Sequence, residues 1–129
     1  MGLFSRRKPV AKPEMSRAEA LAYRPVVSQD VLIEHTDGGL VRISYPVALR
    51  PFIAGMARRL GRSDAPMRRV LELDEMGSTV WDWLDGRSTA QELAAMLAAR
   101  YGLHEREAEV SMAAYLRELG RRGIIGLSR

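Results

Sequence analysis

Few side chains in this chain could perform chemistry, and their spacing limits what that chemistry could be. The 129 residues include two histidines, His35 and His104, and no cysteine. Neither histidine has another three or four residues away, so the spacing indicates no metal site. The absence of cysteine excludes disulfides, thiolate nucleophiles and cysteine-ligated zinc. We expect His35 at the surface end of a strand and His104 at the start of a helix.

Carboxylates and glycines also form no catalytic pattern. One predicted helix carries four carboxylates, Asp74, Glu75, Asp82 and Asp85. An acid–base pair would need an apolar pocket that raises one pKa, and the sequence implies none. These groups suit the N-terminus and the solvated face of a helix. Gly120 and Gly123 follow a helix rather than open one, which does not suit a phosphate loop. We predict no enzyme and no bound metal or cofactor.

Two tryptophans are the remaining candidates for a functional role. Trp81 and Trp83 lie two positions apart, so they cannot share one face of a helix. We expect Trp81 in the core. Trp83 is a candidate contact residue, because tryptophan is enriched in binding hot spots.

The composition is typical of one globular domain. Apolar residues make up 47% and charged residues 28% of the chain. No apolar run reaches the length of a membrane span, and the first residues lack the apolar stretch of a secretory signal. We therefore expect a cytoplasmic protein with one modest core.

The formal charge of +4 is unevenly distributed. Residues 1–24 hold six basic groups against two glutamates, and residues 50–69 hold six arginines against one aspartate. Residues 70–118 hold ten carboxylates against four arginines. The helical part of the chain is therefore acidic, whereas the N-terminal segment and the middle are basic.

Residues 1–24 predict a basic flexible tail, and residues 25–129 predict a single domain. Within the tail, a short helix is expected near Ser16–Tyr23, where Ser16 and Glu19 match a capping box. A basic tail of this kind is a candidate for contact with anionic lipid, although one short segment anchors weakly.

The first half of the domain predicts a hairpin and an insert. Residues 26–35 favour a strand, Asp37-Gly38-Gly39 a turn, and residues 40–45 a second strand that Pro46 ends. An insert at about residues 46–66 has a helical apolar spacing with arginines on its other faces. It is interpreted as a helix that packs on the sheet, and contact with a membrane or an acidic partner is the alternative.

The second half predicts a strand followed by three helices. After a third strand at residues 69–73, Asp74 caps a helix that ends at Gly86. A second helix begins at Ser88 with a Gln91 capping box, and a third spans residues 105–119. Their expected buried residues are Met76, Val80, Trp81, Leu84, Leu93, Met96, Leu97, Tyr101, Ala108, Met112, Tyr115, Leu116 and Leu119. The predicted fold class is α+β: a winged-helix-like, three-stranded antiparallel sheet followed by a three-helix bundle.

These segments resemble a known family. Residues 69–86 read Arg-Val-Leu-Glu-Leu-Asp-Glu-Met-Gly-Ser-Thr-Val-Trp-Asp-Trp-Leu-Asp-Gly. Further segments are Ser88-Thr-Ala-Gln-Glu-Leu93, Arg100-Tyr-Gly102, Tyr115-Leu-Arg-Glu-Leu119 and Arg122-Gly-Ile-Ile125. In this order and spacing they are similar to the PqqD family over roughly residues 66–127, and the hairpin at 26–46 matches more weakly. Members are small peptide-binding chaperones first known from pyrroloquinoline quinone biosynthesis, and related domains recognise ribosomally made peptides that are later modified.

The resemblance implies β-augmentation. The leader of a precursor peptide would add as a strand to the third strand and lie between it and the third helix. The chain would then present the precursor to a modifying enzyme of the radical SAM type. The implied strand edge comprises Arg68, Arg69, Val70, Leu71, Glu72 and Leu73. The implied helix wall comprises Ser111, Tyr115 and Glu118. For Val70, Leu71 and Leu73 the alternative is a plain core role, which must hold for one face of the strand.

Two features depart from the family. The family usually joins its second and third strands by a short turn, whereas about 20 residues intervene here. The insert could cover the groove, extend it or contact the partner enzyme. The basic tail is also additional. A link to quinone synthesis does not follow, and a homodimer stays open.

Two other functions are alternatives. In a DNA-binding winged helix the third helix would read the major groove and should carry Arg or Lys. Here residues 105–119 carry four glutamates against two arginines, which disfavours nucleic acid as a partner. The second alternative is a structural subunit of an enzyme complex that binds no leader.

Overall fold

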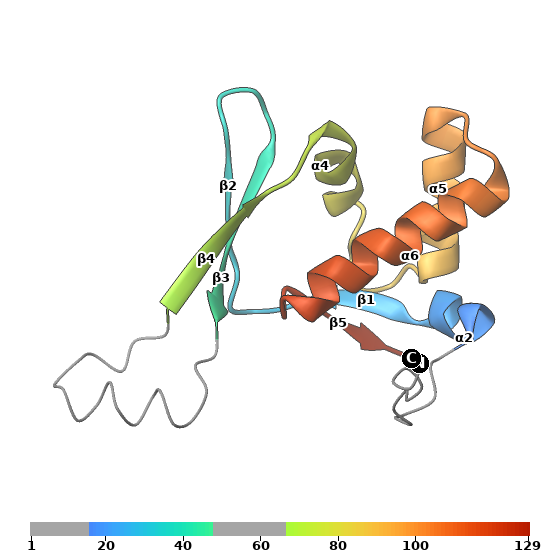
Figure 1. Ribbon diagram of the computed structural model, residues 1–129, viewed down its shortest axis with the longest axis horizontal. Coiled ribbons are helices and arrows are strands. Elements are labelled where there is room, and N and C mark those ends of the chain that lie inside the picture. Colours follow the sequence, from blue (N-terminus) through green and yellow to red (C-terminus); the bar gives the residue numbers. More distant parts are fainter. Residues whose placement is uncertain (1–15, 48–66) are drawn as a thin grey trace, which may run out of the picture.

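The computed structural model describes residues 16–47 and 67–129. In chain order the elements are α2 (Arg17–Ala22), β1 (Arg24–Val27), β2 (Leu32–His35), β3 (Val41–Val47), β4 (Met67–Glu72), α4 (Glu75–Trp81), α5 (Ala90–Tyr101), α6 (Glu105–Arg121) and β5 (Ile125–Ser128). The predicted α+β fold class is confirmed: three antiparallel strands precede the three main helices. The sheet of β2, β3 and β4 stands beside the helices, and β1 and β5 pass below α6 (Figure 1).

The predicted hairpin is formed by β2 and β3, which pair from Leu32 with Ser44 to His35 with Val41. Gly39 has a φ of 84°, which glycine adopts without the cost that a side chain would add. The expected first strand at 26–35 is wrong as one element. A turn at Ser28–Asp30, where Asp30 N–H donates to the Ser28 hydroxyl, divides it into β1 and β2.

Pro46 does not end β3, which continues to Val47. The Thr36 N–H donates to the Leu40 carbonyl, so residues 40, 42, 44 and 46 direct their backbone groups toward β2. The pairing with β2 stops at Ser44. Pro46 therefore lies beyond the last residue that pairs with β2, where its missing N–H costs no hydrogen bond. On the opposite side of β3, Pro46 is paired with Arg68 of β4.

The helix that follows β4 is capped as predicted but is shorter than predicted. Asp74 accepts a hydrogen bond from Gly77 N–H at 2.7 Å. The helix ends at Trp81 rather than near Gly86, because Trp83 N–H and Leu84 N–H bond to carbonyls only three residues back. Trp83 therefore lies outside the helix, half-buried against the core, as Trp81 is.

The second and third helices also follow the sequence with small shifts. The capping box of α5 uses Thr89 and Glu92, one residue later than predicted, and Gly102 ends the helix with a φ of 67°. His104 caps α6, as its expected position implied. Met96 is 41% exposed and is not a core residue. Glu118 lies in the last turn of α6, which extends to Arg121.

Both ends of the described chain meet in a second, two-stranded sheet. The strands β1 and β5 pair antiparallel, from Arg24 with Ser128 to Val27 with Ile125. The helix α2 has the predicted Ser16–Glu19 capping box. Leu21 is buried in the core, so residues 16–24 belong to the fold. Residues 1–15 and the insert between β3 and β4, residues 48–66, lie outside the described part.

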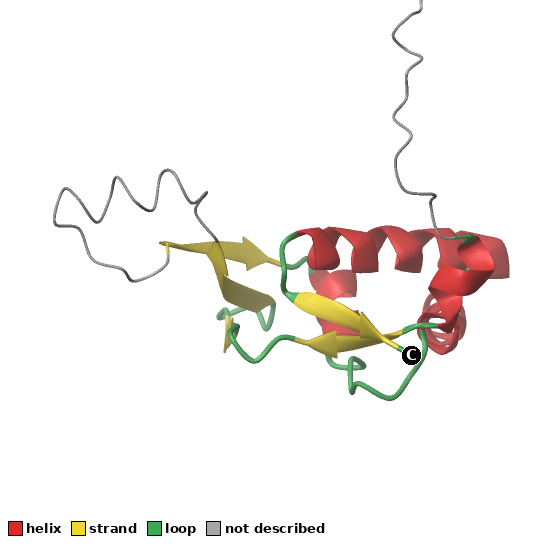
Figure 2. Ribbon diagram, turned by 90° about the horizontal axis from the view of Figure 1, so that it is seen from below, coloured by secondary structure: helices red, strands yellow, loops and turns green. Residues whose placement is uncertain are grey.

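The core lies between the inner face of the larger sheet and the helices. Its buried residues are Leu21, Val41, Ile43, Tyr45, Leu73, Val80, Ala90, Leu93, Ala94, Leu97, Ala108, Met112, Leu116, Leu119, Ile124 and Ile125. Seen from below, the helices and the β1–β5 ribbon form one body from which the larger sheet extends (Figure 2). In the described residues, no helix is both long and apolar enough to cross a bilayer.

Candidate functional site

One edge of β4 is open in the described structure. The strand pairs with β3, and the order β2–β3–β4 places it at the end of the sheet. Leu73 N–H donates to the Val41 carbonyl at 2.8 Å, so alternate residues Leu71 and Arg69 also direct their backbone groups to β3. The N–H and C=O groups of residues 68, 70 and 72 point the other way. Among the described residues no strand occupies that side.

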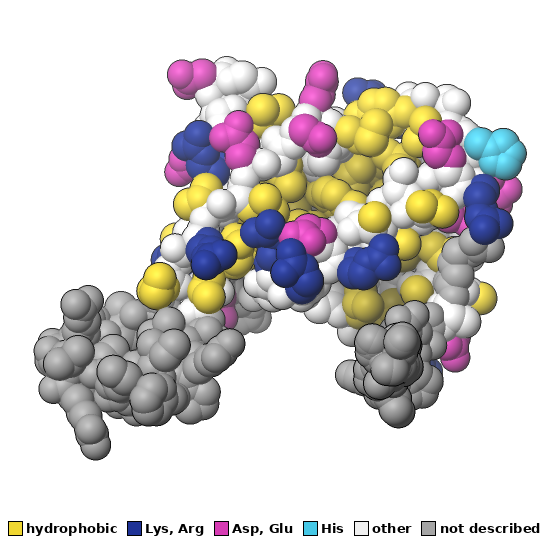
Figure 3. All heavy atoms as spheres, viewed as in Figure 1, with side chains coloured by type: hydrophobic (Ala, Val, Ile, Leu, Met, Phe, Trp, Pro, Cys, Tyr) yellow, Lys and Arg dark blue, Asp and Glu magenta, His cyan; other side chains and the backbone are white. Residues whose placement is uncertain are grey.

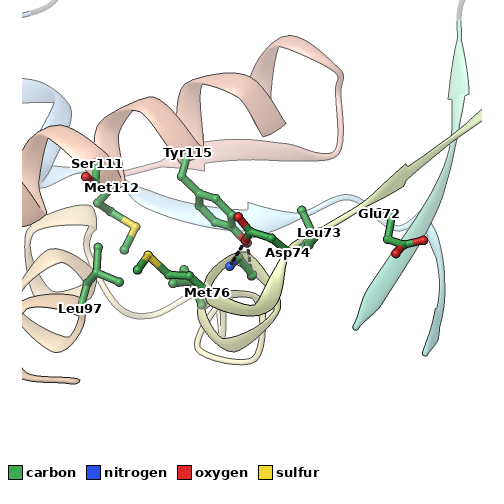
Figure 4. Close-up of a pocket in the computed structure, with 10 residues that line it drawn as sticks. Glu72, Leu73, Asp74, Met76, Leu97, Ser111, Met112 and Tyr115 are labelled. Atoms are coloured by element: carbon green, nitrogen blue, oxygen red, sulfur yellow. Dashed lines mark hydrogen bonds between the residues drawn. The ribbon is translucent and has the colours of Figure 1, made fainter. Parts of the chain in front are cut away.

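A recess lies between the end of β4 and α6. It has a volume of about 330 Å³. Its lining residues come from β4, α4, α5 and α6 and are Glu72, Leu73, Asp74, Met76, Gly77, Val80, Leu97, Ser111, Met112 and Tyr115. Met76, Leu97 and Met112 approach one another across it (Figure 4). An apolar hollow next to a free strand edge can hold a side chain of a strand that adds to the edge.

Tyr115 connects the two walls of the recess. Its hydroxyl on α6 donates to the Gly77 carbonyl on α4 at 2.8 Å. Burial, followed by the nearby charges of Asp74 and Asp82, raises the pKa of Tyr115 above its usual value. The hydroxyl therefore stays a hydrogen-bond donor at neutral pH and holds the helices together.

The six predicted edge residues separate onto the two faces of the sheet. Arg68, Val70 and Glu72 lie on the outer face. Arg68 extends across β3 and donates to the Ser44 carbonyl at 2.8 Å and to the Asp30 carbonyl at 3.0 Å. Val70 is 60% exposed, so a core role for it is wrong. Glu72 lines the recess, but its side chain points away from the other lining residues (Figure 4), and its carboxylate is 3.1 Å from Arg42 on β3.

The other three edge residues lie on the inner face. Leu73 is buried at the recess, and Leu71 is half-buried against the core, so for these two the core role holds. Arg69 is exposed and lies opposite Tyr45. The edge therefore offers backbone groups along its length, with an apolar residue at one end and a guanidinium at the other.

A second hollow of about 520 Å³ lies at the Arg69 end. Tyr45, Pro46 and Val47 of β3, Arg69 of β4, and Gly120, Arg121, Arg122 and Gly123 after α6 line it. Arg122 donates to the Tyr45 hydroxyl at 2.5 Å and to the Glu118 carboxylate at 2.7 Å. These two bonds raise the pKa of Arg122, in that order of importance.

The three predicted residues of the helix wall have different positions. Ser111 is exposed on the recess, and Tyr115 is half-buried in it. Glu118 does not line either hollow, because its carboxylate is held by Arg121 and Arg122. Those two guanidinium groups lower the pKa of Glu118. Glu118 therefore holds Arg121 and Arg122 in position at the second hollow.

Sequence reasoning missed most of the recess. Met76, Leu97 and Met112 have helical apolar spacing, and that pattern reads as core whether or not a hollow adjoins it. Arg122 also gave no signal, since its partner Tyr45 lies 77 residues away. In the described residues no three His, Asp or Glu side chains gather as a metal site would require.

The sequence of this region matches a known family. Residues 63–125 match coenzyme PQQ synthesis protein D, PqqD. This segment of the chain belongs to the PqqD family. The PqqD match includes β4, all three main helices and the first residue of β5, so both hollows and the free edge lie largely within it. Domains of the PqqD kind are typically non-catalytic binding modules.

Two solved structures are similar in fold to this chain. TbiB1 in complex with the TbiA(β) leader peptide matches with a TM-score of 0.54 and 19% identity, over 78% of this chain and 93% of that chain. The second is the PqqD truncation of Methylobacterium extorquens PqqCD, described as a functional, stand-alone recognition element for ribosomally synthesised and post-translationally modified peptides. It matches with a TM-score of 0.54 and 17% identity, over 88% of this chain and 95% of that chain. The comparison with curated proteins gives no match.

Proposed function

We propose that this chain captures the leader of a ribosomally made precursor peptide by strand addition at β4. The captured precursor is presented to a modifying enzyme of the radical SAM type. The observation that carries the proposal is the free edge formed by the backbone groups of residues 68, 70 and 72, beside the wall of α6. Added main-chain hydrogen bonds supply affinity, and the hollows supply selectivity.

The comparisons support a peptide as the occupant. TbiB1, which is similar in fold, is seen with a leader peptide, and the Methylobacterium extorquens domain is a recognition element for such peptides. Membership of the PqqD family agrees with this role. Strand addition leaves the core of the precursor free, so a separate enzyme can reach it.

Hydrogen exchange tests the docking edge. The probe is a 12-residue peptide selected from a random display library on the immobilised full chain. In the free protein, amides 68 and 70 should exchange quickly, whereas amides 69 and 71, bonded to β3, should be protected. Bound peptide should protect 68, 70 and 72. If these amides exchanged equally fast with and without bound peptide, strand addition at β4 would be wrong.

Proline substitution provides a second test at the same edge. Val70→Pro removes an N–H that faces the open side and leaves the bonds to β3 in place. We expect peptide binding to fall at least about tenfold, since ladder bonds are lost. Val70→Ala keeps the N–H and should bind normally. Leu71→Pro is unsuitable, because its N–H pairs with β3. A folded Val70→Pro variant that bound every selected peptide like the wild type would contradict the proposal.

The enzyme partner is tested by co-purification. The full chain, tagged and expressed in its native organism, should recover a modifying enzyme together with a short precursor, identified by mass spectrometry. Precursor recovery should fail with Val70→Pro, while enzyme recovery persists. Recovery of the enzyme without any peptide would favour a structural subunit, and recovery of nucleic acid alone would contradict the proposed class.

A further inference from the structure

The groove along β4 has opposite character at its two ends. At the α4 end, the recess is apolar and Asp74 places a carboxylate at its rim, whereas the Glu72 carboxylate is paired with Arg42. At the other end, arginines line the second hollow. Figure 3 shows basic side chains in a row across this face, from the sheet to the helices. A peptide in the groove therefore meets a different environment at each end.

The basic end has an excess of cationic groups. Arg69, Arg121 and Arg122 line the hollow, and Glu118 is the carboxylate that pairs with two of them, at 2.7 Å each. In the described part of the chain, the Arg69 guanidinium makes no ion pair or hydrogen bond. Because Glu118 pairs with two of the three arginines and leaves Arg69 without a partner among the described residues, this hollow is attractive to a further carboxylate.

The register of β4 sets the distance between the two ends. Arg69 and Leu73 lie on the same inner face, four residues apart, which is about 13 Å along a strand. A strand beside β4 would direct its own alternate side chains into the same two hollows. Because β2, β3 and β4 are all antiparallel, we take the added strand as antiparallel too. Such a strand passes Leu73 first and Arg69 four residues later.

We propose that the groove selects an extended segment in which a large apolar residue is followed, four positions later, by Asp or Glu. The apolar side chain enters the recess beside Leu73, and the carboxylate meets Arg69 and Arg121. This inference rests on the proposed function and adds the chemistry and direction of the peptide. The reversed arrangement would bring the acid to the recess, where the Asp74 carboxylate repels it.

The test uses the display selection on the full chain, followed by binding of the selected peptides in solution. We expect the selected peptides to share an apolar residue and an acid at the fourth position after it. Replacing that acid by its amide should weaken binding roughly fivefold at low salt, since the pair is exposed, and less at high salt.

Charge reversal makes the test specific. Arg69→Glu should weaken binding of the acidic peptides roughly tenfold and restore affinity for peptides that carry Lys at that position. Arg69→Gln keeps a long polar side chain. It should weaken binding of the acidic peptides but should not gain affinity for the peptides that carry Lys. Arg117→Glu is the matched control: Arg117 is exposed on α6, lines a different hollow and should bind like the wild type.

The outcomes separate this inference from the proposed function. Selected peptides that fail on Val70→Pro but show no acid at the fourth position would overturn the charge rule and leave strand addition intact. If the acidic peptides bound equally well to the wild type and to Arg69→Glu, the charge rule would likewise be overturned and strand addition left intact. Selection of peptides that ignore Val70→Pro, or of none, would instead overturn strand addition, and the charge rule with it.

Discussion

The hydroxyl of Tyr115 on α6 donates a hydrogen bond of 2.8 Å to the carbonyl of Gly77 on α4. The two residues are 38 positions apart in the sequence, and their hydrogen bond joins the two helices that flank the recess. A Cβ at position 77 would be in contact with the Tyr115 ring at 3.4 Å and would crowd the Asp74 carboxylate at 3.0 Å. This pair therefore links α6 to α4 at the recess.

Removing the Tyr115 hydroxyl should loosen the groove. Tyr115→Phe deletes a half-buried hydrogen bond, so we expect the free energy of unfolding to fall by about 1 kcal/mol. Urea denaturation measures the change. Tyr101→Phe is the control, because in the described residues the Tyr101 hydroxyl makes no hydrogen bond. Equal stability of both variants would show that the Tyr115–Gly77 bond contributes nothing.

The stabilisation by Tyr115 should depend on pH at the alkaline end. Burial raises the folded-state pKa of Tyr115 above the unfolded value of about 10. Its contribution is therefore fully present below about pH 10 and is lost as the pH rises toward the folded pKa, because the unfolded state releases the proton first. Denaturation at about pH 8 and about pH 11 should show the wild-type advantage over Tyr115→Phe shrinking. An advantage that grew with pH would contradict this assignment.

A methyl group at Gly77 should destabilise the fold. The added Cβ would lie 3.0 Å from the Asp74 carboxylate oxygen that caps α4. Overpacking should outweigh the gain in helix propensity, for a net loss of about 1 kcal/mol in Gly77→Ala. Gly120→Ala is the control on α6, where nothing lies within 4 Å, and it should stabilise by up to about 1 kcal/mol. Thermal or urea unfolding distinguishes the two signs.

The buried hydroxyl of Ser78 should stabilise the junction of β3 and α4. Its hydroxyl, 7% exposed, accepts a 2.8 Å hydrogen bond from the buried Val41 N–H. Ser78→Ala leaves that N–H without its acceptor, at an expected cost of about 2 kcal/mol. Thr79→Ala removes an exposed bond within α4 and should change stability by less than about 0.5 kcal/mol. Chemical denaturation of both variants checks the contrast.

Filling the recess should block peptide binding without unfolding the chain. Ser111 is exposed on α6 and faces the recess, so Ser111→Arg places a large side chain over it. We expect affinity for the selected peptides to fall at least about tenfold, measured by fluorescence anisotropy. Ala114→Arg adds the same side chain at an exposed position that lines neither hollow of the groove. If both variants bound equally well, the recess would not be part of the site.

Local patterns in the sequence predicted much of the fold. The turn at Asp37-Gly38-Gly39, the Asp74 cap and the Ser16–Glu19 box each depend on residues a few positions apart. Such interactions form within one turn or hairpin, so the residue types suffice to predict them. The family membership followed in the same way, from the order and spacing of these local signals.

Long-range pairing was beyond the sequence. Arg24–Val27 and Ile125–Ser128 are each four residues long and about 100 residues apart, and no local pattern indicates that they pair. The geometry of the site also depends on pairing between distant segments. Which β4 residues face outward follows from the hydrogen bond between Leu73 and Val41, and a shift of one residue would exchange the two faces.

The sequence by itself therefore determined that a strand enters a capped helix, that helices follow, and that no constellation for catalysis was expected. Only the tertiary structure decided that the edge of this strand is open among the described residues, that an apolar recess adjoins one end and that Arg69 and Arg122 line one hollow at the other. The reason is physical: caps and turns are local interactions, whereas a groove exists only where elements distant in the chain pack side by side.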